Sequence, residues 1–322
     1  MDQSRRRRGQ RRHVDKACQL LRTALPRLDA WTSETLTRSR CTPLLIQVDE
    51  LARLLAGPEA ARPVVLDVRY RMGTSAGPQE FEESHLPGVS YVAMDTELAT
   101  IRADGVGGRH PMPTVETFSA AMRSAGVAMS RPVVAYDDWA SLPASRVWWM
   151  LRHLGFLDVR VLDGGIAAWT ASGQLTESGP ATPGAGDFTA SSMGVGHLLN
   201  ATDATAYAVG HLLLDARPAD RFRGENETID AVAGHIPGAA SAPALANIDR
   251  HGHFRPAEEL ARRFHELGAE DGKIVGTYCG SGIQATHLAL ALSIAGITDG
   301  ADVYIGSWSD WITSPGRPIA LG

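Results

Sequence analysis

Residues 64–69 read VVLDVR, and residues 212–217 read LLLDAR. Each stretch joins three large apolar residues, typical of a buried strand, to an Asp and an Arg separated by one residue. A histidine, a proline and a glycine follow each stretch, as HLPG at 85–88 and as HIPG at 235–238. The Asp and His lie 18 residues apart in the first copy and 20 apart in the second. The chain therefore contains a duplicated unit, and this repeat decides the fold.

The repeat extends beyond these two motifs. Residues 132–136 read PVVAY and align with KIVGTY at 273–278, and Trp169 aligns with Trp311 at the same offset of 142 residues. Short apolar runs alternate with helical patterns such as 144–154 and 285–295. This alternation predicts an α/β domain in each copy, with a mostly parallel sheet flanked by helices.

A length of 322 residues suits two domains of ordinary size. We expect the boundaries to follow composition. The segments are a basic, disordered extension at 1–42, a first domain at 43–175, a linker at 176–196 and a second domain at 197–322. The linker is rich in Gly, Ala, Ser, Thr and Pro.

Composition excludes several classes of protein. Hydrophobic residues make up 44% and charged residues 21%, as in globular proteins. No apolar run approaches the roughly 18 residues that would span a bilayer. The net charge is -5, and residues 1–40 carry 11 basic against 4 acidic residues. The rest of the chain is therefore acidic and lacks a basic surface for nucleic acid. We expect no nucleic-acid or membrane partner.

Only three cysteines occur, and none forms a CxxC pair. An odd, sparse set is typical of a reducing compartment, so we expect a cytoplasmic protein without a disulfide framework or a zinc site. Cys18 and Cys41 lie in or beside the basic extension, and we expect both to be inert.

Cys279 stands in a different context. Residues 273–290 read KIVGTYCGSGIQATHLAL, which is a buried strand, a cysteine, a glycine-bearing loop and a helix. Loop amides and a helix N-terminus favour an anion there. A thiol pKa of about 8.5 falls to between roughly 3.5 and 7.5 in such surroundings. We predict a nucleophilic thiolate at Cys279, with the bound substrate contacted by Gly280, Gly282, Ile283 and Gln284.

Two further interpretations follow from the residues. A cysteine phosphatase would need an arginine at position 285 to clamp phosphate, and that residue is Ala, so we disfavour phosphoryl transfer. The Asp-x-Arg and His-x-Pro-Gly motifs occur in both copies, which favours structural roles for their side chains.

The duplication, the His-x-Pro-Gly turns, the loop CGSGI at 279–283 and the closing GSWSDW at 306–311 together resemble two-domain rhodanese-type sulfurtransferases. The resemblance covers about residues 43 to 320. It implies a rhodanese fold in both halves and one active site at their interface. It also implies a double displacement in which Cys279 takes sulfur from a donor, holds it as a persulfide and passes it to cyanide, a thiol or thioredoxin. No metal or organic cofactor is implied.

Within this family the first half is implied to be non-catalytic. At the offset of 142 residues Cys279 is matched by Asp137, which cannot form a persulfide. The first half would then act as scaffold and as one wall of the cleft.

The loop most resembles that of 3-mercaptopyruvate sulfurtransferases, because thiosulfate-preferring relatives place basic residues where Gly280 and Ser281 stand. Ser281 is implied to relay a proton or to hold the substrate carbonyl. Asp95 and His110 fall where these enzymes complete the site from the first domain. Arg221 matches an arginine that binds the anionic donor, and Arg223 is a second candidate for that role.

Two departures keep thiosulfate open as the donor. Asp230 stands where mercaptopyruvate enzymes usually have a second arginine, and Gln284 replaces the usual Thr of the loop. A hypothesis of another class, a non-catalytic binding module on the same scaffold, also stays open, although the retained Cys279 argues against it.

Overall fold

The computed structural model describes residues 43–74, 76–180 and 184–322. Cys18, Cys41 and the basic extension lie outside the described residues. Each copy of the repeat forms its own sheet, with strand order β1-β5-β4-β2-β3 in the first and β7-β6-β8-β9 in the second. Every strand pairing is parallel. The predicted tandem α/β architecture is confirmed.

The first sheet is made of short strands, and its central strands are buried on both faces, as parallel sheets require. Its strands are β1 (Leu45–Ile46), β2 (Val64–Asp67), β3 (Ser90–Tyr91), β4 (Val133–Tyr136) and β5 (Val159–Leu162). The helices around it are α3 (Val48–Leu55), α4 (Ala76–Glu83), α5 (Val115–Ser124), α6 (Leu142–His153) and α7 (Gly165–Ala171), with a 3-10 turn at Glu59–Ala61.

The second half repeats this plan with one strand fewer. Its strands are β6 (Leu212–Asp215), β7 (Ala240–Ser241), β8 (Val275–Tyr278) and β9 (Asp302–Val303). Its helices are α8 (Ala201–Gly210), α9 (Ala219–Arg223), α10 (Ala257–Glu266), α11 (Ile283–Ile294) and α12 (Ser307–Trp311), with a 3-10 turn at Ala244–Asn247. In the part of the chain that the structure describes, no helix combines the length and apolarity needed to cross a membrane.

The repeated motifs make buried contacts within each half, as structural side chains do. Asp67 and Arg69 form an ion pair at 2.8 Å inside the first half. The ring of His85 stacks on Phe81 at a centroid distance of 4.0 Å, and its Nδ1 hydrogen-bonds the Phe81 carbonyl at 2.7 Å. The second copy repeats each of these contacts with its own Asp, Arg, His and Phe. Both motifs therefore hold the chain beside β2 in the first half and β6 in the second.

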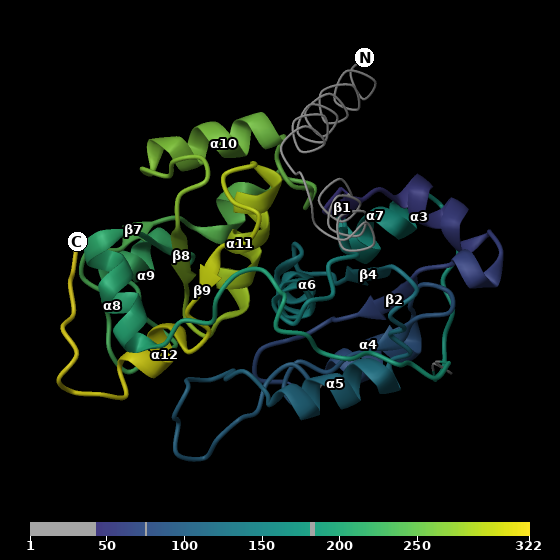
Figure 1. The fold of residues 1–322 in the computed structure, drawn as a ribbon, viewed down its shortest axis with the longest axis horizontal. Coiled ribbons are helices and arrows are strands. Elements are labelled where there is room, and N and C mark those ends of the chain that lie inside the picture. Colours follow the sequence, from purple (N-terminus) through teal and green to yellow (C-terminus); the bar gives the residue numbers. More distant parts are fainter. Residues whose placement is uncertain (1–42, 75, 181–183) are drawn as a thin grey trace, which may run out of the picture.

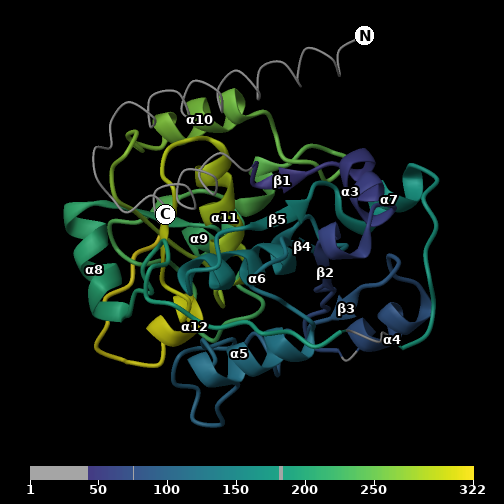
Figure 2. The same ribbon diagram turned by 45° about the vertical axis from the view of Figure 1, so that its right-hand side comes forward.

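The two halves meet through α6 and α11, which lie side by side at the centre of the molecule (Figures 1 and 2). One hydrophobic core runs across this junction and includes Trp148 from the first half and Leu288 from the second. β4 leads through Asp137 into α6, and β8 leads through Cys279 into α11. The equivalent loops of the two copies therefore both lie at the junction.

The segment between the halves is more than a spacer. Gly186 donates its amide to the Arg123 carbonyl at 3.1 Å. Phe188 is fully buried and meets Phe118 edge to face. A composition of small residues concealed this apolar anchor, which fixes the described part of the segment to the first half.

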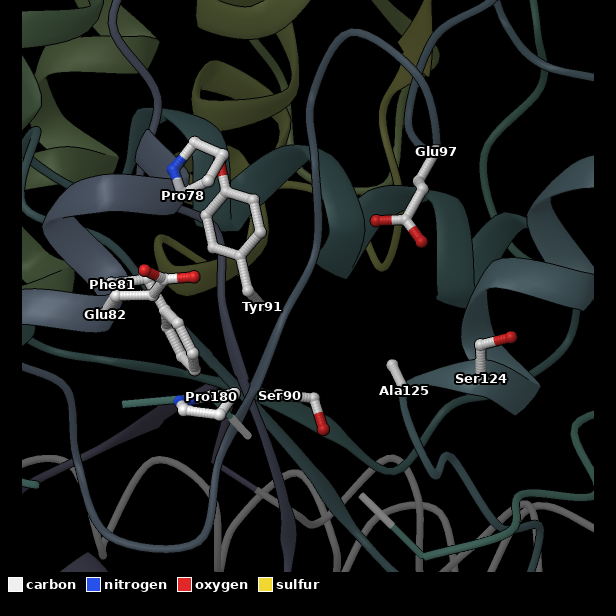
Figure 3. Close-up of a pocket in the computed structure, with 9 residues that line it drawn as sticks. All are labelled: Pro78, Phe81, Glu82, Ser90, Tyr91, Glu97, Ser124, Ala125 and Pro180. Atoms are coloured by element: carbon white, nitrogen blue, oxygen red, sulfur yellow. The ribbon is translucent and has the colours of Figure 1, made fainter. Parts of the chain in front are cut away.

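A cavity of about 310 Å³ lies beside α4 in the first half, where the side chains of Tyr91 and Glu97 face it (Figure 3). Burial raises the pKa of Glu97, and the Ala93 amide partly opposes that shift. None of the residues that line this cavity belongs to the loop of Cys279. It is therefore separate from the candidate site.

Candidate active site

Cys279 follows β8 and is 1% exposed. Its backbone is held on both sides, because its amide donates to Ser307 Oγ at 3.0 Å and its carbonyl accepts from the Trp308 amide at 2.9 Å. Ser307 has a φ of 56°, a left-handed conformation that is uncommon for a residue with a Cβ. Such backbone strain is characteristic of functional sites. The start of α12 therefore fixes the position of the cysteine.

Ser307 was not among the sequence predictions, although the quoted motif at 306–311 contains it. We expect Ser307→Ala to lower the free energy of unfolding by about 1–3 kcal/mol, because the buried Cys279 amide loses its acceptor while the Cβ and the left-handed φ remain. Sulfur-transfer activity should fall with it. Urea unfolding and steady-state rates measure both effects, with exposed Ser192→Ala as the control. Unchanged stability would show that the hydroxyl is dispensable.

The sulfur atom of Cys279 faces the start of α11. The Gly282 amide donates to Sγ at 3.1 Å. Gly282 is the N-cap of this 12-residue helix and has a φ of 88°, which an L side chain rarely adopts. A helix N-terminus with a free amide favours a negative charge on the atom it faces. This geometry suits a sulfur anion.

Two arginines, one from each half, converge above Gly280. A Cβ added to Gly280 would lie 2.9 Å from Arg109 Nη2 and 3.7 Å from Arg221 Nη1. Arg221 is the sequence candidate from α9, whereas Arg109 belongs to a loop of the first half and was missed. The sequence signal that could have found Arg109 is that it immediately precedes the candidate His110. The site thus has two cations immediately beside the cysteine loop.

Buried carboxylates orient both guanidinium groups. Asp230 pairs with Arg109 and accepts from Arg221 Nη2 at 2.8 Å, and Glu227 also accepts from Arg221. Burial alone would raise the pKa of Glu227, but hydrogen bonds from Arg221 and from two backbone amides outweigh it and leave the pKa lowered. Asp230 stands where the resemblance led us to look for a second arginine. The structure instead brings that second cation from the other half.

Asp95 and His110, the two candidates from the first half, lie close together. His110 Nε2 is 3.0 Å from the Tyr70 hydroxyl and 3.5 Å from Asp95 Oδ1. Burial lowers the pKa of His110 to about 3, helped by the charges of two neighbouring arginines. The backbone of Ser281 partly opposes this shift, so the ring lies beside the cysteine loop. His110 is therefore neutral at pH 7.

The other sequence candidates differ in position. Ser281 is 8% exposed within the loop, and Ile283 is buried in the hydrophobic core, where it packs at the start of α11. Gln284 is half-buried one residue later. Arg223 pairs with Glu225 at 2.6 Å, and its side chain is 43% exposed. Arg223 thus pairs with Glu225 at the exposed end of α9 and does not join the group of residues around Cys279.

The equivalent loop of the first copy holds a carboxylate in the same kind of cradle. Asp137 Oδ1 accepts from the amides of Trp139 and Ser141 at 2.8 and 3.0 Å, and Oδ2 accepts from Ala144 at 2.8 Å. Burial raises the pKa of Asp137 to about 6, although the three amides oppose it. Both copies therefore build a loop whose amides bind an anion. Within the described residues the first loop places a carboxylate there and the second places the cysteine sulfur.

Comparisons with known proteins agree with this geometry. Residues 47–172 and 197–314 each match the sequence profile of the rhodanese-like domain. A Mycobacterium tuberculosis protein, named provisionally as a thiosulfate sulfurtransferase, is 39% identical over 282 residues, which are 87% of this chain and 97% of that protein. A Pseudomonas aeruginosa protein, named provisionally as a 3-mercaptopyruvate sulfurtransferase, is 40% identical over 284 residues, which are 86% of this chain and 98% of that protein.

Solved structures give the same family. The 3-mercaptopyruvate sulfurtransferase from Leishmania major has a TM-score of 0.74 and 27% identity, with 86% of this chain and 76% of that chain covered. The Escherichia coli protein SseA, described with the rhodanese fold, has a TM-score of 0.69 and 30% identity, with 83% and 99% covered. With two rhodanese domains and a cysteine loop at their junction, the chain belongs to the rhodanese family and is a sulfurtransferase.

Proposed function

We propose that the protein moves the sulfur of 3-mercaptopyruvate to a thiol, to thioredoxin or to cyanide, and carries it as the sulfane sulfur of a persulfide on Cys279. The observation that carries this proposal is the juxtaposition of an amide aimed at Cys279 Sγ with two arginines above Gly280. The amide favours the attacking thiolate, and the arginines suit a carboxylate-bearing donor. A cytoplasmic, reducing setting would supply the thiol acceptors.

The first step is a nucleophilic displacement on sulfur. The Cys279 thiolate attacks the thiol sulfur of 3-mercaptopyruvate, an S–S bond forms and the C–S bond of the donor breaks. Its electron pair leaves as the enolate of pyruvate, which takes a proton from solvent. The resulting Cys279 persulfide then gives its outer sulfur to the acceptor; cyanide becomes thiocyanate and the thiolate is regenerated.

Arg109 and Arg221 would bind the donor carboxylate, and the amides of the cysteine loop would hold the sulfur. His110 is neutral and lies beside the backbone of Ser281, so its imidazole can contact the donor carbonyl. Ser281 offers a hydroxyl on the same loop. Asp95 and Tyr70 would fix the imidazole from the other side.

Gly280 supports the choice of donor. A side chain at this position would displace Arg109, which approaches to 2.9 Å of the place where a Cβ would lie. A loop with basic residues at 280 and 281 would instead carry its own cations. Thiosulfate is the second candidate donor, because Asp230 replaces a family arginine and two cations would also hold a dianion.

The test is to load the protein with sulfur and compare the donors. After incubation with 3-mercaptopyruvate, mass spectrometry should find one added sulfur atom on the peptide that contains Cys279. The value of kcat/KM for 3-mercaptopyruvate should exceed that for thiosulfate when cyanide is the acceptor in both assays. A higher value for thiosulfate would reverse the donor assignment, and an unmodified Cys279 peptide with either donor would refute the persulfide.

A further inference from the structure

Arg146, in α6 of the first half, is a buried cation with no carboxylate partner among the described residues. The residue is 0% exposed. Its Nε and Nη2 donate to the Leu98 carbonyl at 3.1 and 2.9 Å, and Nη2 also donates to the His110 carbonyl at 2.7 Å. Its Nη1 has no hydrogen-bond partner, and no carboxylate forms an ion pair with it in the described part of the chain. An unpaired buried charge is costly, so its presence needs an explanation.

The unpartnered nitrogen points at the cysteine loop. A Cβ added to Gly282 would lie 3.0 Å from Arg146 Nη1. The amide of Gly282 is the group that donates to Cys279 Sγ at 3.1 Å. Arg146 therefore lies beside the residue whose amide binds the sulfur, whereas Arg109 and Arg221 lie beside Gly280. Burial lowers the pKa of Arg146 to about 10, and the charge of Cys279 is the foremost influence that opposes this shift.

The first copy shows what the same loop does without such a cation. At the offset of 142 residues Arg146 corresponds to Leu288 on α11, which packs beside α6 (Figure 2). The carboxylate of Asp137 has three amide donors, yet its pKa is raised to about 6. The charge of Asp138 in the same loop adds to that rise, although Arg71 pairs with Asp138 at 2.5 Å. At the place that Arg146 occupies beside the cysteine loop, the Asp137 loop therefore has an apolar residue, and its three amides leave the pKa of the buried carboxylate raised.

We propose that Arg146 is a positioning residue that supplies, from the non-catalytic half, the positive charge that keeps the Cys279 sulfur anionic. This inference rests on the proposed function only in taking the Cys279 thiolate as the nucleophile. Other charged or titratable groups also face the loop: Arg109 and Arg221 above Gly280 with their partners Asp230 and Glu227, and His110 with Asp95 and Tyr70. These groups stay in place in the variants below.

The experiment measures the ionisation of Cys279 directly. In a full-length background with Cys18→Ser and Cys41→Ser, the rate of alkylation by iodoacetamide is followed from acid to alkaline pH. Arg146→Gln should raise the midpoint by about one pH unit or more, so alkylation at neutral pH slows about tenfold. Arg146→Lys keeps the positive charge on a shorter side chain, so it should raise the midpoint of alkylation by a smaller amount.

Arg152→Gln is the matched control, because Arg152 is a buried arginine of the same helix whose contacts are the carbonyls of Leu157 and Asp299. Its midpoint should equal that of the parent. If folded Arg146→Gln and Arg146→Lys both keep the parent midpoint, the proposal is wrong and the residue only braces the loop of His110. If Arg146→Gln does not fold, Arg146→Lys decides alone by the same criterion. The assay needs no sulfur donor, so its outcome is independent of whether transfer from 3-mercaptopyruvate is observed.

Discussion

Replacing Cys279 by Ser will lower kcat/KM for sulfur transfer by a factor on the order of 10³ or more. A hydroxyl is not ionised at neutral pH, and oxygen cannot take up sulfur as a persulfide. The fold should survive, because Ser is nearly isosteric and its oxygen can accept from the Gly282 amide that now meets Sγ at 3.1 Å. Thiocyanate formation from cyanide measures the loss.

The chain offers its own controls for that experiment. Cys18→Ser and Cys41→Ser should each retain full activity, because neither residue belongs to the loop after β8. Mass spectrometry of the Cys279→Ser variant should find no sulfur bound after treatment with either donor. Persistent loading would mean that another thiol carries the sulfur, and the assignment of the nucleophile would fail.

Arg109→Gln and Arg221→Gln will each lower kcat/KM by roughly 10- to 150-fold, the equivalent of about 1.5–3 kcal/mol for a charge-assisted hydrogen bond. The loss should lie mainly in KM, since both guanidinium groups flank the donor position above Gly280. In free-energy terms, the loss of kcat/KM in the double variant should be smaller than the sum of the two single losses, because Asp230 pairs with both side chains. Thiosulfate, as a dianion, should be affected more than 3-mercaptopyruvate.

Arg223→Gln separates the two sequence candidates on α9. Its exposed pair with Glu225 predicts unchanged kcat/KM for both donors, as most surface ion pairs contribute little. A loss comparable to that of Arg221→Gln would place Arg223 at the donor after all. If Arg109→Gln changed only thermal stability and left KM intact, the first half would contribute no donor contact.

The parts of the structure that depend on local pattern could be predicted from the sequence. The repeated strands follow from apolar runs, and structural roles for Asp67, Arg69 and His85 follow from their occurrence in both copies, although the partners of these side chains do not. The position of Cys279 between a strand and a helix follows in the same way. These features arise from neighbours in the chain or from the parallel order of the sheet.

Two of the missed residues, Arg109 and Arg146, act across the junction of the two halves. Arg109 reaches a carboxylate 121 residues away in the sequence, and Arg146 approaches a loop from the other copy. No periodicity encodes such a meeting, because it depends on how α6 and α11 pack. Phe188 was missed for a different reason, since one apolar residue among small ones gives no pattern.

Asp230 forms an ion pair with one arginine from each half, so the structure of the site depends on both copies of the repeat. If the two copies were separated, this carboxylate would lose its pair with Arg109. The sulfur of Cys279 would lose both its burial against the first half and the positive charges of Arg109 and Arg146. A chain shortened to its second half would therefore keep Cys279 but lose Arg109 and Arg146 from its surroundings.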